Sequence, residues 1–117
     1  GSYLMRNDAF INLGAYMSFE RIIGLEVVDD AGYQQYREHM MPILKEFGGS
    51  FGFDFKVGEV LKSKTEDSIN RVFTIDFPSM EIMHSFFSDP LYLEVKNKYF
   101  KHSVKSVTTI SVHEKNA

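Results

Sequence analysis

A strand that leads directly into a capped helix is the feature that most constrains the fold of this chain. Phe73, Ile75 and Phe77 occupy every second position, which is the pattern of a strand with two different faces. Pro78 ends the strand because it has no backbone N–H to donate and its φ is fixed. Ser79 is placed to cap the helix that follows. This strand–turn–helix unit indicates a fold but names no reaction.

The other elements follow from the same two periodicities. The expected elements are a strand over 19–28, a helix over 31–47, a strand over 50–61, a polar loop over 62–69, the strand and helix just described, a further helix over 90–102 and a closing strand over 104–112. Asp29 is expected to cap the first helix, Pro42 to kink it, and Gly48 and Gly49 to end it. The order β-α-β-β-α-β predicts an α+β, ferredoxin-like fold with a four-stranded antiparallel sheet.

Length and composition limit the class of protein. The 117 residues suffice for one domain, which we place at 19–117, after an N-terminal arm or tag-derived segment at 1–18. The absence of cysteine excludes disulfides, zinc ribbons and a cysteine nucleophile. A net charge of -3 argues against nucleic acid as a partner. No apolar run reaches the length of a membrane span and no signal peptide is recognisable, so we expect a cytoplasmic protein.

The sheet is expected to have a second apolar face. In the ferredoxin-like arrangement, helices cover only one face of the sheet. The other face would carry Ile22, Val28 and Val72, which is a large apolar surface to leave in water. Two sheets that meet face to face would cover it. We therefore expect a homodimer.

Six short motifs follow one another along most of the chain, from about Arg21 to Glu114. They are Glu26-Val27-Val28-Asp29, Tyr33-Gln34-Gln35-Tyr36-Arg37, Phe47-Gly48-Gly49, Gly58-Glu59-Val60-Leu61, Asp76-Phe77-Pro78-Ser79 and Ser88-Asp89-Pro90-Leu91-Tyr92. Their order resembles the domain-of-unknown-function family 1330. The resemblance implies a dimeric α+β barrel, a group whose members include small monooxygenases, isomerases and haem-handling enzymes.

Carboxylates are the first candidates for chemistry. The alternation places Glu26, Asp54, Thr74 and Asp76 on the sheet face away from the helices. Repulsion and burial would raise the pKa of one carboxyl group, as a general base near neutral pH requires. We assign Glu26 as base, Asp76 as its partner and His39 as an orienting donor. The alternative interpretation is that Glu26 and Asp76 form structural ion pairs with basic residues of neighbouring strands. The basic residues in question are Arg21, Lys56 and Arg71.

Ligand contacts are expected from tyrosine hydroxyls. Tyr33, Tyr36 and Tyr92, together with Asp54 and Thr74, are the predicted ligand-binding residues. Packing of the tyrosines between helix and sheet explains their spacing equally well, and it is the interpretation we favour. The four histidines lack the spacing of a zinc-binding helix, so we expect no metal and no cofactor.

Two functional hypotheses remain from the sequence. The first is a homodimeric barrel that binds an apolar or aromatic small molecule, with cofactor-independent oxygenase or isomerase activity as the candidate reaction. The second is a non-catalytic module for dimerisation or ligand binding. A cavity lined by the predicted residues would separate the two hypotheses.

Overall fold

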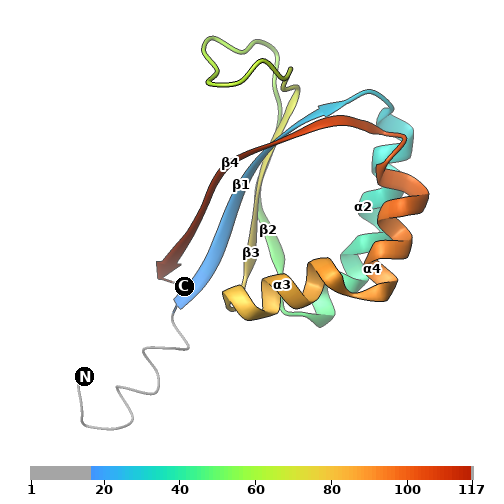
Figure 1. The fold of residues 1–117 in the computed structure, drawn as a ribbon, viewed down its shortest axis with the longest axis vertical. Coiled ribbons are helices and arrows are strands. Elements are labelled where there is room, and N and C mark those ends of the chain that lie inside the picture. Colours follow the sequence, from blue (N-terminus) through green and yellow to red (C-terminus); the bar gives the residue numbers. More distant parts are fainter. Residues whose placement is uncertain (1–16, 117) are drawn as a thin grey trace, which may run out of the picture.

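Four strands and four helical segments make up residues 17–116, which are the residues described by this computed structural model. In chain order they are β1 (Met17–Val27), α2 (Asp30–Glu46), β2 (Ser50–Lys56), β3 (Arg71–Phe77), α3 (Met80–Ser88), α4 (Pro90–Val95), the π-helix η1 (Lys96–Phe100) and β4 (Val104–Asn116). The strands form one sheet in the order β2-β3-β1-β4, with antiparallel neighbours throughout. Figure 1 shows the helices gathered on one face of this sheet. The predicted α+β, ferredoxin-like fold is confirmed.

The helices begin where the sequence predicts, and α2 also ends within one residue of its predicted end. Asp29, Ser79 and Asp89 each accept a hydrogen bond from the backbone N–H three residues on, at 3.0, 3.1 and 3.0 Å. These side chains satisfy N–H groups that have no partner within the helix. Gly48 has a φ of 75°, so a residue without Cβ ends α2. Pro42 lies inside α2, which continues as one helix on both sides of it. None of the described helices is long and apolar enough to cross a membrane.

Strand β2 differs from its prediction in length and in phase. It ends at Lys56 instead of residue 61, and its pairing with β3 shifts register between Phe51 and Asp54. This β-bulge reverses the alternation within the strand, because one extra residue turns every later side chain to the other face. Asp54 therefore lies opposite Phe73 on the helix face. Its predicted place on the outer face is wrong.

The outer strands are longer than predicted. β1 begins at Met17, two residues before the expected start at 19, and β4 continues to Asn116, four residues beyond 112. The predicted arm at 1–18 therefore gives its last two residues to β1, and the rest of it lies outside the described residues. The helix predicted over 90–102 is α4 followed directly by η1, whose wider turns accommodate an extra residue.

An aromatic cluster fills the core between α3, α4 and the sheet. Phe77 on β3 and Phe86 on α3 are almost completely buried, with ring centroids 5.5 Å apart. Tyr92 on α4 lies 4.5 Å from Phe86, and Phe87 packs against Phe77 at 5.5 Å. Such tilted and edge-on rings bury a large apolar area while keeping favourable ring geometry. The strand–turn–helix unit thus supplies one side of the core.

We predict that Phe77→Ala lowers the free energy of unfolding by about 3–5 kcal/mol, because it leaves a cavity in this cluster. Urea denaturation of the purified variant measures the change. Leu61→Ala is the control, since Leu61 is 88% exposed and should lose little stability. A loss below about 1 kcal/mol for Phe77→Ala would contradict the packing described here.

Candidate functional site

A cavity of about 560 Å³ lies between the helix face of the sheet and the helices. All four strands contribute to its wall, together with α2, α3, α4 and η1. Most of the lining is apolar or aromatic, as at Met40, Phe73 and Ile75. Met80 and His84 on α3 and Val107 and Val112 on β4 line the cavity and are exposed, so they mark its open side. The volume falls in the range of small-molecule sites in proteins.

Two tyrosines bring a polar group into this apolar space. The hydroxyl groups of Tyr36 on α2 and Tyr92 on α4 form a buried hydrogen bond of 2.9 Å. Burial raises the pKa of both phenols, and that of Tyr36 is raised further by the neighbouring Tyr92. Both side chains line the cavity and are neutral at physiological pH. They can therefore offer hydrogen bonds without introducing a charge.

Arg21 is the charged group of the inner wall. It lies on β1 opposite Ile75, and its guanidinium carbon is 4.7 Å from the centre of the Phe87 ring. Its Nε atom is buried and has no hydrogen-bond partner among residues 17–116. Burial lowers the pKa of Arg21 below its usual value, but arginine keeps its charge at neutral pH. The sequence suggested Arg21 only as an ion-pair partner, because a strand arginine gives no sign of which side chains surround it.

The three predicted ligand-binding tyrosines all reach the cavity. Tyr33 lines it beside Tyr36, with the two rings stacked at a centroid distance of 5.7 Å, and Tyr92 lies across from them. The packing role that we favoured also holds, since all three side chains belong to the buried core. Binding of a ligand by these residues stays a prediction.

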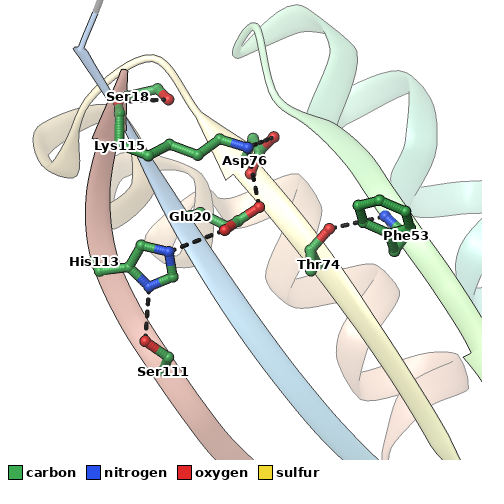
Figure 2. Close-up of polar contacts among 8 residues, drawn as sticks. All are labelled: Ser18, Glu20, Phe53, Thr74, Asp76, Ser111, His113 and Lys115. Atoms are coloured by element: carbon green, nitrogen blue, oxygen red, sulfur yellow. Dashed lines mark hydrogen bonds and ion pairs between the residues drawn. The ribbon is translucent and has the colours of Figure 1, made fainter. Parts of the chain in front are cut away.

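The other two predicted ligand-binding residues lie elsewhere. Asp54 accepts hydrogen bonds from Arg71 at 2.8 and 2.9 Å and lies 3.0 Å from Arg37. The hydrogen bond from Arg71 holds the pKa of Asp54 below its usual value. Thr74 faces away from the helices, and its hydroxyl accepts a bond of 2.8 Å from the backbone of Phe53 (Figure 2). Neither residue lines the cavity. Asp54 thus forms ion pairs with two arginines, and Thr74 holds the bulged backbone of β2 through a hydrogen bond.

The predicted catalytic residues do not converge. Asp76 pairs across the sheet with Glu20, and Glu26 lies six residues further along β1. At a rise of about 3.4 Å per residue, the two predicted carboxylates are roughly 20 Å apart. The expectation that Glu26 and Asp76 share a cleft is wrong, although both lie on the outer face. The alternation identified the face but carries no information about register.

His39 is also remote from both carboxylates. It is exposed on α2, where its Nδ1 lies 2.8 Å from the carbonyl oxygen of Gln35. Its ring stacks on Tyr99 with centroids 4.5 Å apart. None of Glu26, Asp76 and His39 lines the cavity. Their predicted catalytic roles gain no support from this arrangement.

The outer face has an ionic cluster that the sequence did not predict. Glu20 bonds His113 at 2.9 Å and Lys115 at 3.1 Å, and Lys115 lies 3.4 Å from Asp76 (Figure 2). The hydrogen bond from Lys115 lowers the pKa of Glu20. Burial raises the pKa of Asp76, and the negative charge of Glu20 adds to that effect. Within residues 17–116, no three acidic or histidine side chains are grouped so that they could hold a metal ion.

We predict that Asp76→Asn raises stability at neutral pH. Because the pKa of Asp76 is higher in the folded than in the unfolded state, ionisation of this group costs the folded state free energy. That cost appears as the pH rises above the unfolded pKa, and it is complete above the folded pKa. Urea denaturation at a series of acidic and neutral pH values should therefore show a gain that vanishes in acid.

Asp54→Asn is the matched control, and its effect should have the opposite sign. The pKa of Asp54 is lower in the folded state, so its stabilising effect is present above the unfolded pKa and is lost in acid. The variant should be less stable than wild type at neutral pH. Equal responses of the two variants would contradict the environments described for these two carboxylates.

Comparisons with known proteins agree with this fold. The structure of a protein of unknown function from Rhodopseudomonas palustris matches 100% of this chain and 97% of its own, at 15% identity and a TM-score of 0.69. A dimeric protein of unknown function from Bacteroides fragilis, also ferredoxin-like, matches 86% and 96% of the two chains, at 10% identity and a TM-score of 0.52. The structure of a candidate antibiotic biosynthesis monooxygenase from Nitrosomonas europaea matches 86% of this chain and 91% of its own, at 10% identity and a TM-score of 0.58.

These likenesses concern the fold alone, because all three identities are low. A search of curated proteins finds no match. The family comparison covers most of the chain, since residues 21–112 match the model described as "Domain of unknown function (DUF1330)". That range contains every element except the outer ends of β1 and β4. The chain belongs to the DUF1330 family.

Proposed function

We propose that this protein binds an apolar, aromatic small molecule in the cavity between its sheet and its helices. The observation that carries the proposal is the cavity itself, about 560 Å³ with a mainly apolar and aromatic wall. Sites for small molecules typically combine such a wall with a few polar groups that fix the orientation of the ligand. Here the polar groups of the inner wall are Arg21 and the hydroxyl pair of Tyr36 and Tyr92.

The shape of the wall suits a flat molecule. Phe51, Phe73, Phe87 and Phe100 line the space from four different elements. Aromatic ligands gain from offset or edge-on contact with such rings beyond the burial of apolar area. The exposed residues Met80 and His84 leave one end of the cavity accessible from solvent.

Turnover of the bound molecule is the second candidate function, with a cofactor-independent oxygenase or isomerase reaction. The hydroxyl pair of Tyr36 and Tyr92 favours it, because a neutral donor in an apolar site can stabilise negative charge that develops on a substrate oxygen. The fold shared with the Nitrosomonas europaea protein is consistent with this candidate. Oxygen consumption and product mass, followed with each bound aromatic compound, distinguish an enzyme from a binding module.

We predict that 2-naphthol raises the melting temperature of the protein, because a ligand that binds only the folded state stabilises it. Val112→Trp should abolish the shift by filling the cavity from β4, where Val112 is part of the lining. Val60→Trp is the matched control, since Val60 lies outside the lining and is exposed to nearly the same extent as Val112, 43% against 45%. If a panel of neutral bicyclic aromatics gave no shift, or if both variants responded alike, the cavity would not be the binding site.

We propose in addition that two copies of the chain associate through the outer faces of their sheets. No helix within residues 17–116 covers this face. Phe53 and Phe55 stack on each other there with centroids 5.8 Å apart, and they are 64% and 56% exposed. Exposed apolar surface of this kind is typical of interfaces between subunits. The dimeric Bacteroides fragilis relative shares the fold, which is consistent with this assembly.

We predict a dimer in sedimentation velocity experiments at micromolar concentration. Phe55→Lys should shift the equilibrium towards monomer, because it places a charge in the proposed contact. Leu61→Lys, in the exposed loop between β2 and β3, should leave the assembly unchanged. A wild-type protein that stays monomeric at all concentrations would refute this arrangement.

A further inference from the structure

Arg21 is a partly buried cation with an incomplete set of contacts. Its Nε–H is shielded from solvent and has no acceptor among the described residues. A buried donor left without a partner costs free energy, and a buried charge costs more. The Phe87 ring at 4.7 Å offers attraction to the cation but does not replace a hydrogen-bond acceptor. The unused donor points to a group that is absent from the chain itself.

The other two arginines of the described residues, Arg37 and Arg71, provide a comparison for the contacts of Arg21. Arg37 and Arg71 also lie over aromatic rings, and both are neutralised by Asp54 at distances of 3.0 and 2.8 Å. No carboxylate of residues 17–116 forms an ion pair with Arg21. Arg21 is therefore the arginine of the described fold whose charge has no counterpart.

The lining of the cavity as a whole also has positive charges without negative ones. Its lining includes Arg21 and Lys96, together with the exposed His84, but no aspartate or glutamate. The chain has a net charge of -3, so the positive lining does not follow from its composition. A positive, mainly apolar cleft favours an anion with an apolar body.

A second hydrogen-bond donor lies beside Arg21. Only one hydrogen is used in the bond between the hydroxyl groups of Tyr36 and Tyr92. Whichever tyrosine accepts that hydrogen keeps its own, and no further acceptor for it occurs in the described fold. The Phe87 ring lies 4.7 Å from the guanidinium carbon of Arg21 and 5.5 Å from the ring of Tyr92, so the two donors share one region of the cavity. Two donors without an acceptor are suited to the two oxygens of a carboxylate.

We infer that the ligand of this cavity is an aromatic carboxylate, held by Arg21 and by the hydroxyl pair of Tyr36 and Tyr92. The inference rests on the proposed function, because it specifies the chemical class of the molecule that the cavity binds. The ring system packs among the phenylalanines of the wall, and the carboxylate lies against Arg21. Lys96 supports the binding through its charge.

The experiment compares two probes of nearly the same size, 2-naphthoate and 2-naphthamide, by isothermal titration calorimetry. Wild type should bind the carboxylate about ten- to 100-fold more tightly than the amide, as expected for charge-assisted hydrogen bonds in a shielded site. Arg21→Met should remove this preference by weakening 2-naphthoate while 2-naphthamide still binds. Its fold should be retained, because an apolar side chain of similar length replaces a partly buried charge that has no ion-pair partner among the described residues.

Lys101→Met is the matched control, since it removes the same charge from an exposed position outside the cavity and should keep the preference. Equal affinity of wild type for the two probes, or an undiminished preference in Arg21→Met, would overturn the inference and leave the aromatic site itself intact. Failure of both probes to bind wild type would overturn the aromatic site and the inference together. Tighter binding of the amide would also refute the role of Arg21.

Discussion

The buried hydrogen bond between Tyr36 and Tyr92 is the contact on which the interior of this protein depends. It joins α2 to α4, which also pack directly against each other, and both rings continue into the aromatic core. A hydroxyl pair in an apolar interior is stable only while both partners are present, because either one alone would be an unsatisfied polar group. The two helices are therefore held at a fixed separation. The space between them and the sheet persists because large aromatic side chains, and not a close helix-to-sheet contact, set that distance.

The charged side chains on the two faces of the sheet differ in their ion-pair partners. On the outer face, Glu20 and Asp76 lie among Lys115 and His113, so that opposite charges are interspersed over neighbouring strands. On the helix face, Arg37 and Arg71 share Asp54, while no carboxylate of residues 17–116 forms an ion pair with Arg21. The contrast arises within one sheet of four strands and shows that the solitary cation is a local property of the cavity wall. A structural role would have been served better by an apolar residue at this position.

Local features of this fold were accessible from the sequence, whereas long-range ones were not. Caps such as Asp29 and Ser79, and the alternation in β3, depend on a few neighbouring residues and were predicted correctly. The bulge in β2 could not be predicted, because Gly52 and Phe53 interrupt the alternation only through their pairing with Thr74 on β3. The same limit applies to the candidate site. The tyrosines that line the cavity were identified from their helical spacing, but the partner of Asp76 and the surroundings of Arg21 depend on strand register.

The π-helix η1 has a consequence for how this cavity can change in evolution. A π-turn arises where a helix accommodates one additional residue, and Lys96 and Phe100, at its two ends, both line the cavity. Deletion of a single residue in this segment would restore the α-helical pitch and leave the residues on either side of it close to their present positions around the helix axis. Only the stretch of wall between Lys96 and Phe100 would then change, while α2, the sheet and the remaining lining stayed in place. A one-residue insertion or deletion here is thus a simple route by which related proteins could enlarge or reshape the pocket for a different molecule.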